Sequence, residues 1–364
     1  VGSSSVYSPV VYFQNSQSTF DSKNLFTAEE DKRYEVESMT LFDADQDGDL
    51  DLYLVSGGNQ FEAGSELYND RLLINDGYGN FVNDLKRIPN LNSNGCVVRP
   101  IDYDSDGDID LFIGGHNKPG AFPLADKSYL LNNNNGNFED FTNAVLPDLD
   151  QFGLVTDAQW ADLNKDRRED LILVGEYSPV AIFLNLNSGF QRLSSKTLDE
   201  AMGLWRCIEV VDFDDDGDLD LLLGNLGKNN MLSVSPETPL IISTRDLDKN
   251  GSVDPLMFNS QQNKNGEWDM FPVQFWDNLT QQSPLFRKEF NSYHAFSKAN
   301  MNYYQEKEYL IKDSLLSAKH DTSKWLENLG SNTFKLNTLP DPLQLGPIND
   351  FLVIETAEDQ SVFV

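Results

Sequence analysis

Five short acidic loops hold the residues of this sequence whose chemistry is easiest to infer. Three of them follow the pattern D-x-D-x-D-G-x-x-D and read DADQDGDLD at 43–51, DYDSDGDID at 102–110 and DFDDDGDLD at 212–220. Two looser copies read DLNKDRRED at 162–170 and DLDKNGSVD at 246–254. Alternating carboxylates and a main-chain carbonyl supply the oxygen ligands that Ca²⁺ prefers, in a flexible cage that suits it better than the smaller Mg²⁺.

We therefore expect several structural calcium ions, one for each of the five loops. In every loop the ligands would be the side chains at positions 1, 3, 5 and 9 and the carbonyl at position 7. In the three strict loops these residues are Asp43, Asp45, Asp47, Asp49, Asp51, Asp102, Asp104, Asp106, Asp108, Asp110, Asp212, Asp214, Asp216, Asp218 and Asp220. In the two looser loops they are Asp162, Asn164, Asp166, Arg168, Asp170, Asp246, Asp248, Asn250, Ser252 and Asp254.

The crowding of carboxylates favours a bound cation. Two carboxylates about 5 Å apart repel each other by roughly 3 kcal/mol at an effective dielectric constant near 20. Glycine at position 6 permits the left-handed bend that such a loop needs. The loop at 162–170 has Arg167 there instead and is expected to be weaker.

Two alternative interpretations of the loops are less consistent with the sequence. An EF-hand requires glutamate at position 12 and flanking helices, but position 12 is Leu54, Ile113 or Leu223 within β-rich runs. Simple hairpin turns capped by their own side chains would explain one copy. They do not explain three strict copies in register with a strand repeat.

A repeat of about sixty residues predicts the elements that position these loops. The first aspartates, at 43, 102 and 162, are 59 and 60 residues apart, and a strand ending in asparagine recurs at 75, 132 and 185. Each repeat accommodates about four strands, and radial stacking buries the faces of such small sheets. We predict an all-β β-propeller spanning 1–364 as one domain, with about seven four-stranded blades, the first and last incomplete. The last three blades are expected near 204–239, 240–308 and 309–364.

One segment, about 285–324, departs from the strand pattern. Phe286, Phe290 and Tyr293 follow a helical spacing. The segment contains seven basic and five acidic residues, although the whole chain has a net charge of −32. We expect a helical insertion that either packs on the propeller or docks a partner.

Composition limits the possible partners and compartments. The net charge of −32 argues against nucleic acid. No apolar run is long enough for a transmembrane segment, and the first residues lack the pattern of a signal peptide, so we expect a processed or truncated piece. Cys96 and Cys207 suggest neither a disulfide framework nor a zinc cluster.

At the acidic loops the chain resembles the FG-GAP or VCBS repeat family of integrin-type propellers. The phrases GGHNKPGAFP at 114–123, GLWRCIEVVDFDDDGDLDLLLGNLGKNN at 203–230 and DPLQLGPINDFLV at 341–353 resemble its bacterial branch with an ASPIC-type C-terminal domain, although no such domain is visible here. The resemblance implies a calcium-binding propeller outside the cell, often an outer-membrane lipoprotein, sometimes an accessory of SusCD-like nutrient-uptake complexes.

Two classes of function are consistent with these features. The first is a binding or scaffolding module without enzymatic activity, whose long loops at 56–70 and 115–128 present Phe61, Tyr68, His116 and Phe122 to a protein or glycan. The alternative is a calcium-dependent glycan lyase or hydrolase that uses His116, His294, His320 or unpaired carboxylates. No nucleophile or metalloprotease signature supports the second class.

Overall fold

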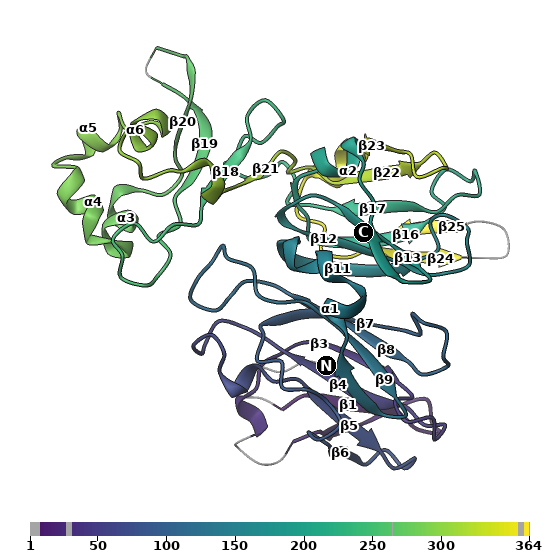
Figure 1. Cartoon of the computed structure of the whole chain (residues 1–364). Coiled ribbons are helices and arrows are strands. Elements are labelled where there is room, and N and C mark those ends of the chain that lie inside the picture. The colour runs from purple at the N-terminus through teal and green to yellow at the C-terminus, as the bar shows by residue number, and fades with distance from the viewer. Residues whose placement is uncertain (1–7, 27–30, 264, 356–359, 364) are drawn as a thin grey trace. The chain divides into compact units, whose positions relative to one another are not determined.

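A computed structural model describes residues 8–26, 31–263, 265–355 and 360–363. These residues form an all-β protein with short helices and seven sheets (Figure 1). The chain divides into two compact units. Unit 1 comprises residues up to 119, 125–171 and 183–192, and unit 2 comprises 120–124, 172–182 and residues from 193 onward. In the part of the chain described here, no helix combines the length and apolar character needed to cross a bilayer.

Unit 1 begins with a β-hairpin and a four-stranded meander. Their strands are β1 (Val10–Gln14), β2 (Phe20–Asn24), β3 (Val36–Phe42), β4 (Asp51–Ser56), β5 (Arg71–Asn75) and β6 (Phe81–Asn83). Strand β4 is buried along its whole length because both faces of its sheet are covered. Leu52 and Leu54 lie in one apolar cluster with Phe26, and Tyr53 and Val55 lie in another with residues of the following sheet. Face-to-face stacking of sheets, as the repeat predicted, therefore forms the core of this unit.

Two further sheets continue the same strand order. Their strands are β7 (Gly95–Ile101), β8 (Asp110–Gly115), β9 (Tyr129–Asn134), β10 (Asn137–Asp140), β11 (Leu154–Ala161), β12 (Asp170–Ser178), β13 (Ala181–Leu186) and β14 (Gly189–Arg192). Short β15 (Gly203–Leu204) pairs with β12. The short helices α1 (Thr142–Val145) and α2 (Lys196–Glu200) follow β10 and β14. The repeat of about sixty residues thus corresponds to four strands, as predicted.

The sheet that follows differs from the predicted succession of blades. Strands β16 (Cys207–Val211) and β17 (Asp220–Gly224) pair with β22 (Lys324–Asn328) and β23 (Phe334–Thr338), in the order β16-β17-β22-β23. About a hundred residues therefore separate two neighbouring strands of one sheet. The predicted blade near 204–239 is in fact completed by residues 324–338.

The intervening residues form a separate sheet with helices. Its strands, in the order β20-β19-β18-β21, are β18 (Leu240–Ser243), β19 (Met257–Gln262), β20 (Trp268–Pro272) and β21 (Leu315–Ala318). Its helices are α3 (Trp276–Gln282), α4 (Pro284–Glu289), α5 (Tyr293–Phe296) and α6 (Met301–Glu306). Figure 1 shows these helices grouped beside β19 and β20.

The helical insertion expected at 285–324 is therefore displaced toward the N-terminus. The helices span 276–306, while β21 and the start of β22 occupy the end of the expected range. Phe286 and Phe290 are buried in one cluster with Phe258 of β19. Tyr293, predicted on the same face, is 55% exposed. The helices pack on the sheet of their own insertion.

The last described strands, β24 (Leu352–Glu355) and β25 (Gln360–Phe363), form a two-stranded sheet. The described residues thus give four-stranded sheets, one five-stranded sheet and two hairpins. The closure of the sheets into a ring and the number of seven blades remain predictions from the sequence.

Candidate metal centres

Each acidic loop joins two consecutive antiparallel strands, as the sequence predicted. The loops lie between β3 and β4, β7 and β8, β11 and β12, β16 and β17, and β18 and β19. In three hairpins the residue before position 1 pairs with the aspartate at position 9: Phe42 with Asp51, Ile101 with Asp110, and Val211 with Asp220. Position 9 is the first residue of the returning strand in four loops and precedes β19 in the loop at 246–254. It is buried in all five loops.

The aspartate at position 1 organises the turn of every loop. Its carboxylate accepts a hydrogen bond from the main-chain N–H of position 6, at distances between 2.7 and 3.1 Å, in all five loops. In four loops its other oxygen accepts from the N–H of position 5. The side chain at position 5 then accepts from the N–H of position 7 in all five loops. Strict and loose copies therefore share one backbone conformation.

That conformation requires two residues with positive φ in each loop. Position 4 has φ between 60° and 62° at Gln46, Ser105, Lys165, Asp215 and Lys249. Position 6 is glycine with φ between 88° and 95° in four loops. Arg167 occupies position 6 in the remaining loop at φ 71°, where a side chain is disfavoured. The sequence analysis identified the requirement at position 6 and missed the one at position 4.

The aspartate at position 9 connects its hairpin to the third strand of the sheet. One oxygen of Asp51 accepts from the N–H of Ala44 (2.9 Å) and the other from the N–H of Asn75 (2.8 Å). The equivalent third-strand donors are Asn133, Asn185 and Asn328, at 2.7 to 2.9 Å. Each carboxylate oxygen has a second lone pair, so these bonds leave position 9 able to bind a cation as well.

Three carboxylates converge in four of the five loops. Oxygens from positions 1, 3 and 9 all lie within 4.8 Å of one another in the groups Asp43–Asp45–Asp51, Asp102–Asp104–Asp110, Asp212–Asp214–Asp220 and Asp246–Asp248–Asp254. Two oxygens that bind one Ca²⁺ at about 2.4 Å can be no farther apart than about 4.8 Å. The predicted ligands at position 5, which include Asp47, Asp106 and Asp216, are not in these groups.

Unpaired buried oxygens in the first loop fit a cation. One oxygen each of Asp43, Asp45 and Asp49 is buried without a hydrogen-bond donor from the described residues. Burial of a carboxylate oxygen without a partner is costly. A hard divalent cation at the group Asp43–Asp45–Asp51 would give the carboxylates of Asp43 and Asp45 a partner. The side chain of Asp49 lies outside the converging group Asp43–Asp45–Asp51, so Asp49 stays a predicted ligand through its carbonyl only.

The electrostatic environment of position 9 also favours a cation. Burial, together with the neighbouring carboxylates Asp104 and Asp106, raises the pKa of Asp110 to about 7, although the main-chain hydrogen bonds from Asn133 and Tyr103 lower it. Burial likewise raises the pKa values of Asp170 and Asp220 to about 6. A raised pKa means that the protein alone stabilises the ionised form of these carboxylates poorly. A bound cation would stabilise that form.

The loop at 162–170 contains a cation of its own. The guanidinium of Arg168 donates to the Asp166 carboxylate at 2.8 Å, to the Asn185 carbonyl at 2.8 Å and to the Asn187 side chain at 2.7 Å. Asp162, Asn164 and Asp170 keep the hydrogen bonds of the other loops. This loop therefore has the common conformation, with part of its negative charge already neutralised.

Neighbouring loops of unit 1 are connected through side-chain amides. Asn133 donates to the carbonyl of Ala44 (2.9 Å), and Asn185 donates to the carbonyl of Tyr103 (2.8 Å). Gln46 donates to the carbonyl of Gly107 at 3.1 Å and also to the Asp108 carboxylate. The first three loops thus lie side by side along one edge of the stacked sheets.

The sequence analysis found the asparagine repeat but assigned it no role. The predicted asparagines Asn75 and Asn185 are the residues whose N–H groups bond to the aspartate at position 9. In the run of asparagines at 132–135, however, it is Asn133 that occupies the equivalent position, because its N–H bonds to Asp110. Periodicity alone does not distinguish adjacent identical residues.

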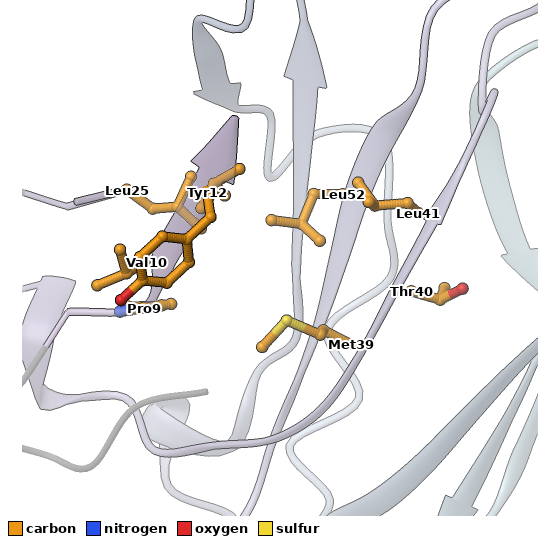
Figure 2. Close-up of a pocket in the computed structure, with 9 residues that line it drawn as sticks. Pro9, Val10, Tyr12, Leu25, Met39, Thr40, Leu41 and Leu52 are labelled. Atoms are coloured by element: carbon orange, nitrogen blue, oxygen red, sulfur yellow. The ribbon is translucent and has the colours of Figure 1, made fainter. Parts of the chain in front are cut away.

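Figure 2 shows a second feature of unit 1, an apolar cleft of about 280 Å³ between β1 and the strands β3 and β4. Val10 and Tyr12 lie on one side, and Met39, Leu41 and Leu52 lie on the other. Among the described residues that line this cleft, Thr40 and Tyr12 provide the only hydroxyl groups. Such a lining offers little chemistry beyond hydrophobic contact.

The stacked sheets and their acidic hairpins define a protein built from repeated four-stranded units. A family model of FG-GAP-like repeats matches residues 102–173 and 162–223. Each match begins at the first aspartate of one loop and ends in the strand that follows the next loop. The chain therefore contains FG-GAP-like repeats, in agreement with the resemblance inferred from sequence, while closeness to the ASPIC-type branch stays a prediction.

Two solved structures are similar to this chain at low sequence identity. No curated protein matches the chain. Among solved structures, an Agrocybe aegerita lectin described as recognising non-reducing terminal N-acetylglucosamine has 12% identity and a TM-score of 0.38, with 94% of this chain and 93% of the lectin covered. The V. cholerae biofilm matrix protein Bap1 has 10% identity and a TM-score of 0.24, with 84% of this chain and 66% of that protein covered.

Proposed function

We propose that the protein is a calcium-stabilised repeat module that binds a partner and has no enzymatic activity. The observation that carries the calcium proposal is the convergence of three carboxylates in each of four equivalent hairpin loops. A bound Ca²⁺ would supply positive charge and a cross-link between the two strands of each hairpin. The residues that would hold it are those at positions 1, 3 and 9, with positions 5 and 7 completing the set.

The protein's own groups already orient these ligands. Hydrogen bonds from the N–H of position 6 hold the carboxylate of position 1, and bonds from the third strand hold that of position 9. Because the side chains are held before any ion binds, little conformational entropy remains to be lost on binding. This favours a structural role over a switch.

Ordered loops support the proposal of a binding surface. Asn117 donates to Asn59 at 2.8 Å, which connects the long loop after β8 to the one after β4. Tyr68 is buried and its hydroxyl bonds to the main chain of Phe61. Tyr68 therefore shapes its loop and does not present its ring to a ligand as expected, whereas Phe61 remains partly exposed.

The proposed site of action is the surface of a bacterial cell, as an accessory of a nutrient-uptake complex of the SusCD type. Support comes from the FG-GAP-like repeats and from the acidic loops, since calcium is abundant outside the cell and extracellular modules can bind it even at low affinity. A pull-down from solubilised cell envelopes tests the partner. Recovery of the protein alone would contradict this part of the proposal.

Removal of calcium tests the central claim. Because an ion that binds only the folded state stabilises it, we expect excess EDTA to lower the melting temperature and added Ca²⁺ to restore it. Elemental analysis of protein purified without chelator should find several calcium ions per chain. An absence of calcium together with an unchanged melting temperature would refute the proposal.

A further inference from the structure

A polar cavity of about 410 Å³ lies in unit 2, beside the sheet β16-β17-β22-β23. Its walls come from the connection that leaves β17, from the connection that returns to β22, and from the first residue of β22 and the last of β23. The lining residues are Lys228, Leu232, Ser233, Val234, Ser235, Pro236, Lys319, His320, Asp321, Thr322, Lys324 and Thr338. Its volume lies within the range of about 300 to 1,000 Å³ typical of small-molecule sites.

Positive charge is concentrated in this cavity. Three lysines line it against one carboxylate, Asp321, although the whole chain has a net charge of −32. Lys324 is fixed by a hydrogen bond from its ammonium to the Thr338 hydroxyl at 2.8 Å. The ammonium of Lys228 lies 3.5 Å from the exposed carboxylate of Asp341. Lys319 has no side-chain partner among the described residues.

The cations of the cavity influence one another. Burial lowers the pKa of Lys324, and the proximity of Lys228 lowers it further, while Asp321 opposes both effects. Burial lowers the pKa of His320 to about 4, and Lys324 and Lys319 contribute to this shift, so its imidazole is neutral at pH 7. Ammonium groups that line one cavity gain from an anion placed between them.

These lysines do not serve to balance the nearby acidic loop. Lys324 pairs with Leu223 near the end of β17, whereas the acidic loop lies before Asp220 at its start. Asn328, at the far end of β22, is the residue that bonds to Asp220. The cavity and the acidic loop are therefore at opposite ends of the sheet, separated by about 13 Å at roughly 3.3 Å per residue.

We propose that this cavity binds the carboxylate or sulfate group of an acidic sugar, with Lys319, Lys324 and Lys228 as the anion ligands. The hydroxyls of Ser233 and Thr322 can bond to sugar hydroxyls, and the aliphatic side chains of Leu232 and Val234 can contact the ring. This inference rests on the proposed binding function and names the class of its ligand. Salt screening weakens the effect of the acidic loop at 212–220 on the cavity, because their separation of about 13 Å exceeds the Debye length of about 8 Å at physiological ionic strength.

Titration of the calcium-loaded protein with glucuronate, by NMR or calorimetry, tests the proposal. Glucose serves as the neutral control and inorganic sulfate as the control without a ring. We expect saturable binding of glucuronate that weakens with added salt, no binding of glucose, and weaker binding of sulfate. Absence of glucuronate binding would overturn the proposal, and sulfate binding as tight as glucuronate binding would overturn its sugar component.

A pair of matched variants locates the site. Lys319→Met keeps much of the side-chain volume and should weaken glucuronate binding at least about tenfold, because it removes one charge-assisted hydrogen bond. Lys335→Met removes an exposed lysine of β23 that pairs with Glu327 and lies outside the cavity lining, and it should leave binding unchanged. Equal effects of the two variants would overturn the assignment. The EDTA-dependent shift in melting temperature, measured on the same samples, reports separately on the calcium proposal.

Discussion

At the scale of single residues, the strict and loose loops should differ in how much they depend on calcium. Asp106 and Asp166 both occupy position 5, but Asp166 is already paired with the Arg168 guanidinium at 2.8 Å. We expect Asp106→Ala to remove more of the calcium-dependent stability than Asp166→Ala, because Arg168 already neutralises part of the charge of Asp166, whereas no ion pair is found for Asp106 among the described residues.

The measurement is the difference in melting temperature with and without EDTA for each variant. Wild-type protein provides the reference difference. Equal losses in the two variants, or a larger loss for Asp166→Ala, would show that the ranking of the two loops is wrong.

The strained conformation of Arg167 leads to a second prediction. A non-glycine residue in the left-handed region destabilises the folded state by about 1–2 kcal/mol. Replacement by glycine relieves this strain but costs about 0.4–1 kcal/mol, because glycine gives the unfolded chain more conformational entropy. Arg167→Gly should therefore stabilise the protein by about 0.5–1 kcal/mol. Arg167→Ala removes the same charge but keeps the strain of a positive φ, because alanine also has a Cβ atom. It therefore serves as the matched control.

Urea unfolding in saturating calcium gives the free energy of unfolding of both variants. If Arg167→Ala stabilised the protein as much as Arg167→Gly, the cause would be the lost charge and the argument from backbone strain would fail.

At the scale of elements, the amides that connect neighbouring sheets should contribute to stability. Asn133 is 1% exposed, donates to the carbonyls of Ala44 and Ile109 and accepts from the N–H of Gly136. Asn133→Ala should cost about 2–3 kcal/mol, because a buried polar group left without its partner costs about 1–3 kcal/mol.

Asn134→Ala is the matched control for this prediction. Asn134 belongs to the same asparagine run, is exposed, and its side-chain oxygen accepts from the exposed side chain of Asn135. Its replacement should change the free energy of unfolding by less than about 0.5 kcal/mol. Comparable losses from the two substitutions would contradict the proposed connection between sheets.

The local pattern of the sequence was sufficient to predict the five hairpin loops and the three carboxylates that converge in four of them. Alternation of apolar residues, position 6 glycines and the fixed spacing of aspartates all act within one hairpin, so they can be recognised without knowing the fold. The pairing of β17 with β22 has no such local signal, because about a hundred residues intervene. For that reason the sequence analysis placed successive blades where the structure has an insertion.

The roles of Arg168 and Asn133 were also beyond local reasoning. The guanidinium of Arg168 reaches Asn185 and Asn187 on a neighbouring strand and its turn, and the Asn133 amide reaches Ala44 in the loop of another sheet. Both contacts depend on how strands are stacked. Position 4 was missed for a different reason, since the residues that adopt positive φ there share no side-chain type.

At the scale of the whole molecule, charge is distributed unevenly. Acidic residues gather in the hairpin loops, whereas three lysines line the cavity of unit 2 and further basic residues lie in or beside the inserted helices. Arg287 and Lys288 in α4, and Lys298 after α5, are exposed. Phe286 and Phe290 of the same segment are buried. The apolar face of the insertion is thus used for packing, while its basic residues remain available to a partner.

Charge reversal tests whether the inserted helices dock a partner. The triple variant Arg287→Glu, Lys288→Glu and Lys298→Glu should reduce co-purification of the partner from solubilised envelopes and leave the melting temperature of the isolated protein nearly unchanged, because exposed charges contribute little to stability. Reversal of the exposed Lys86, Lys127 and Lys196 is the matched control, since it changes the net charge equally at sites outside the insertion. Loss of the partner in the first variant alone would assign docking to the helices. Retention of the partner in both would assign the helices to packing only and place the binding surface on the loops between strands.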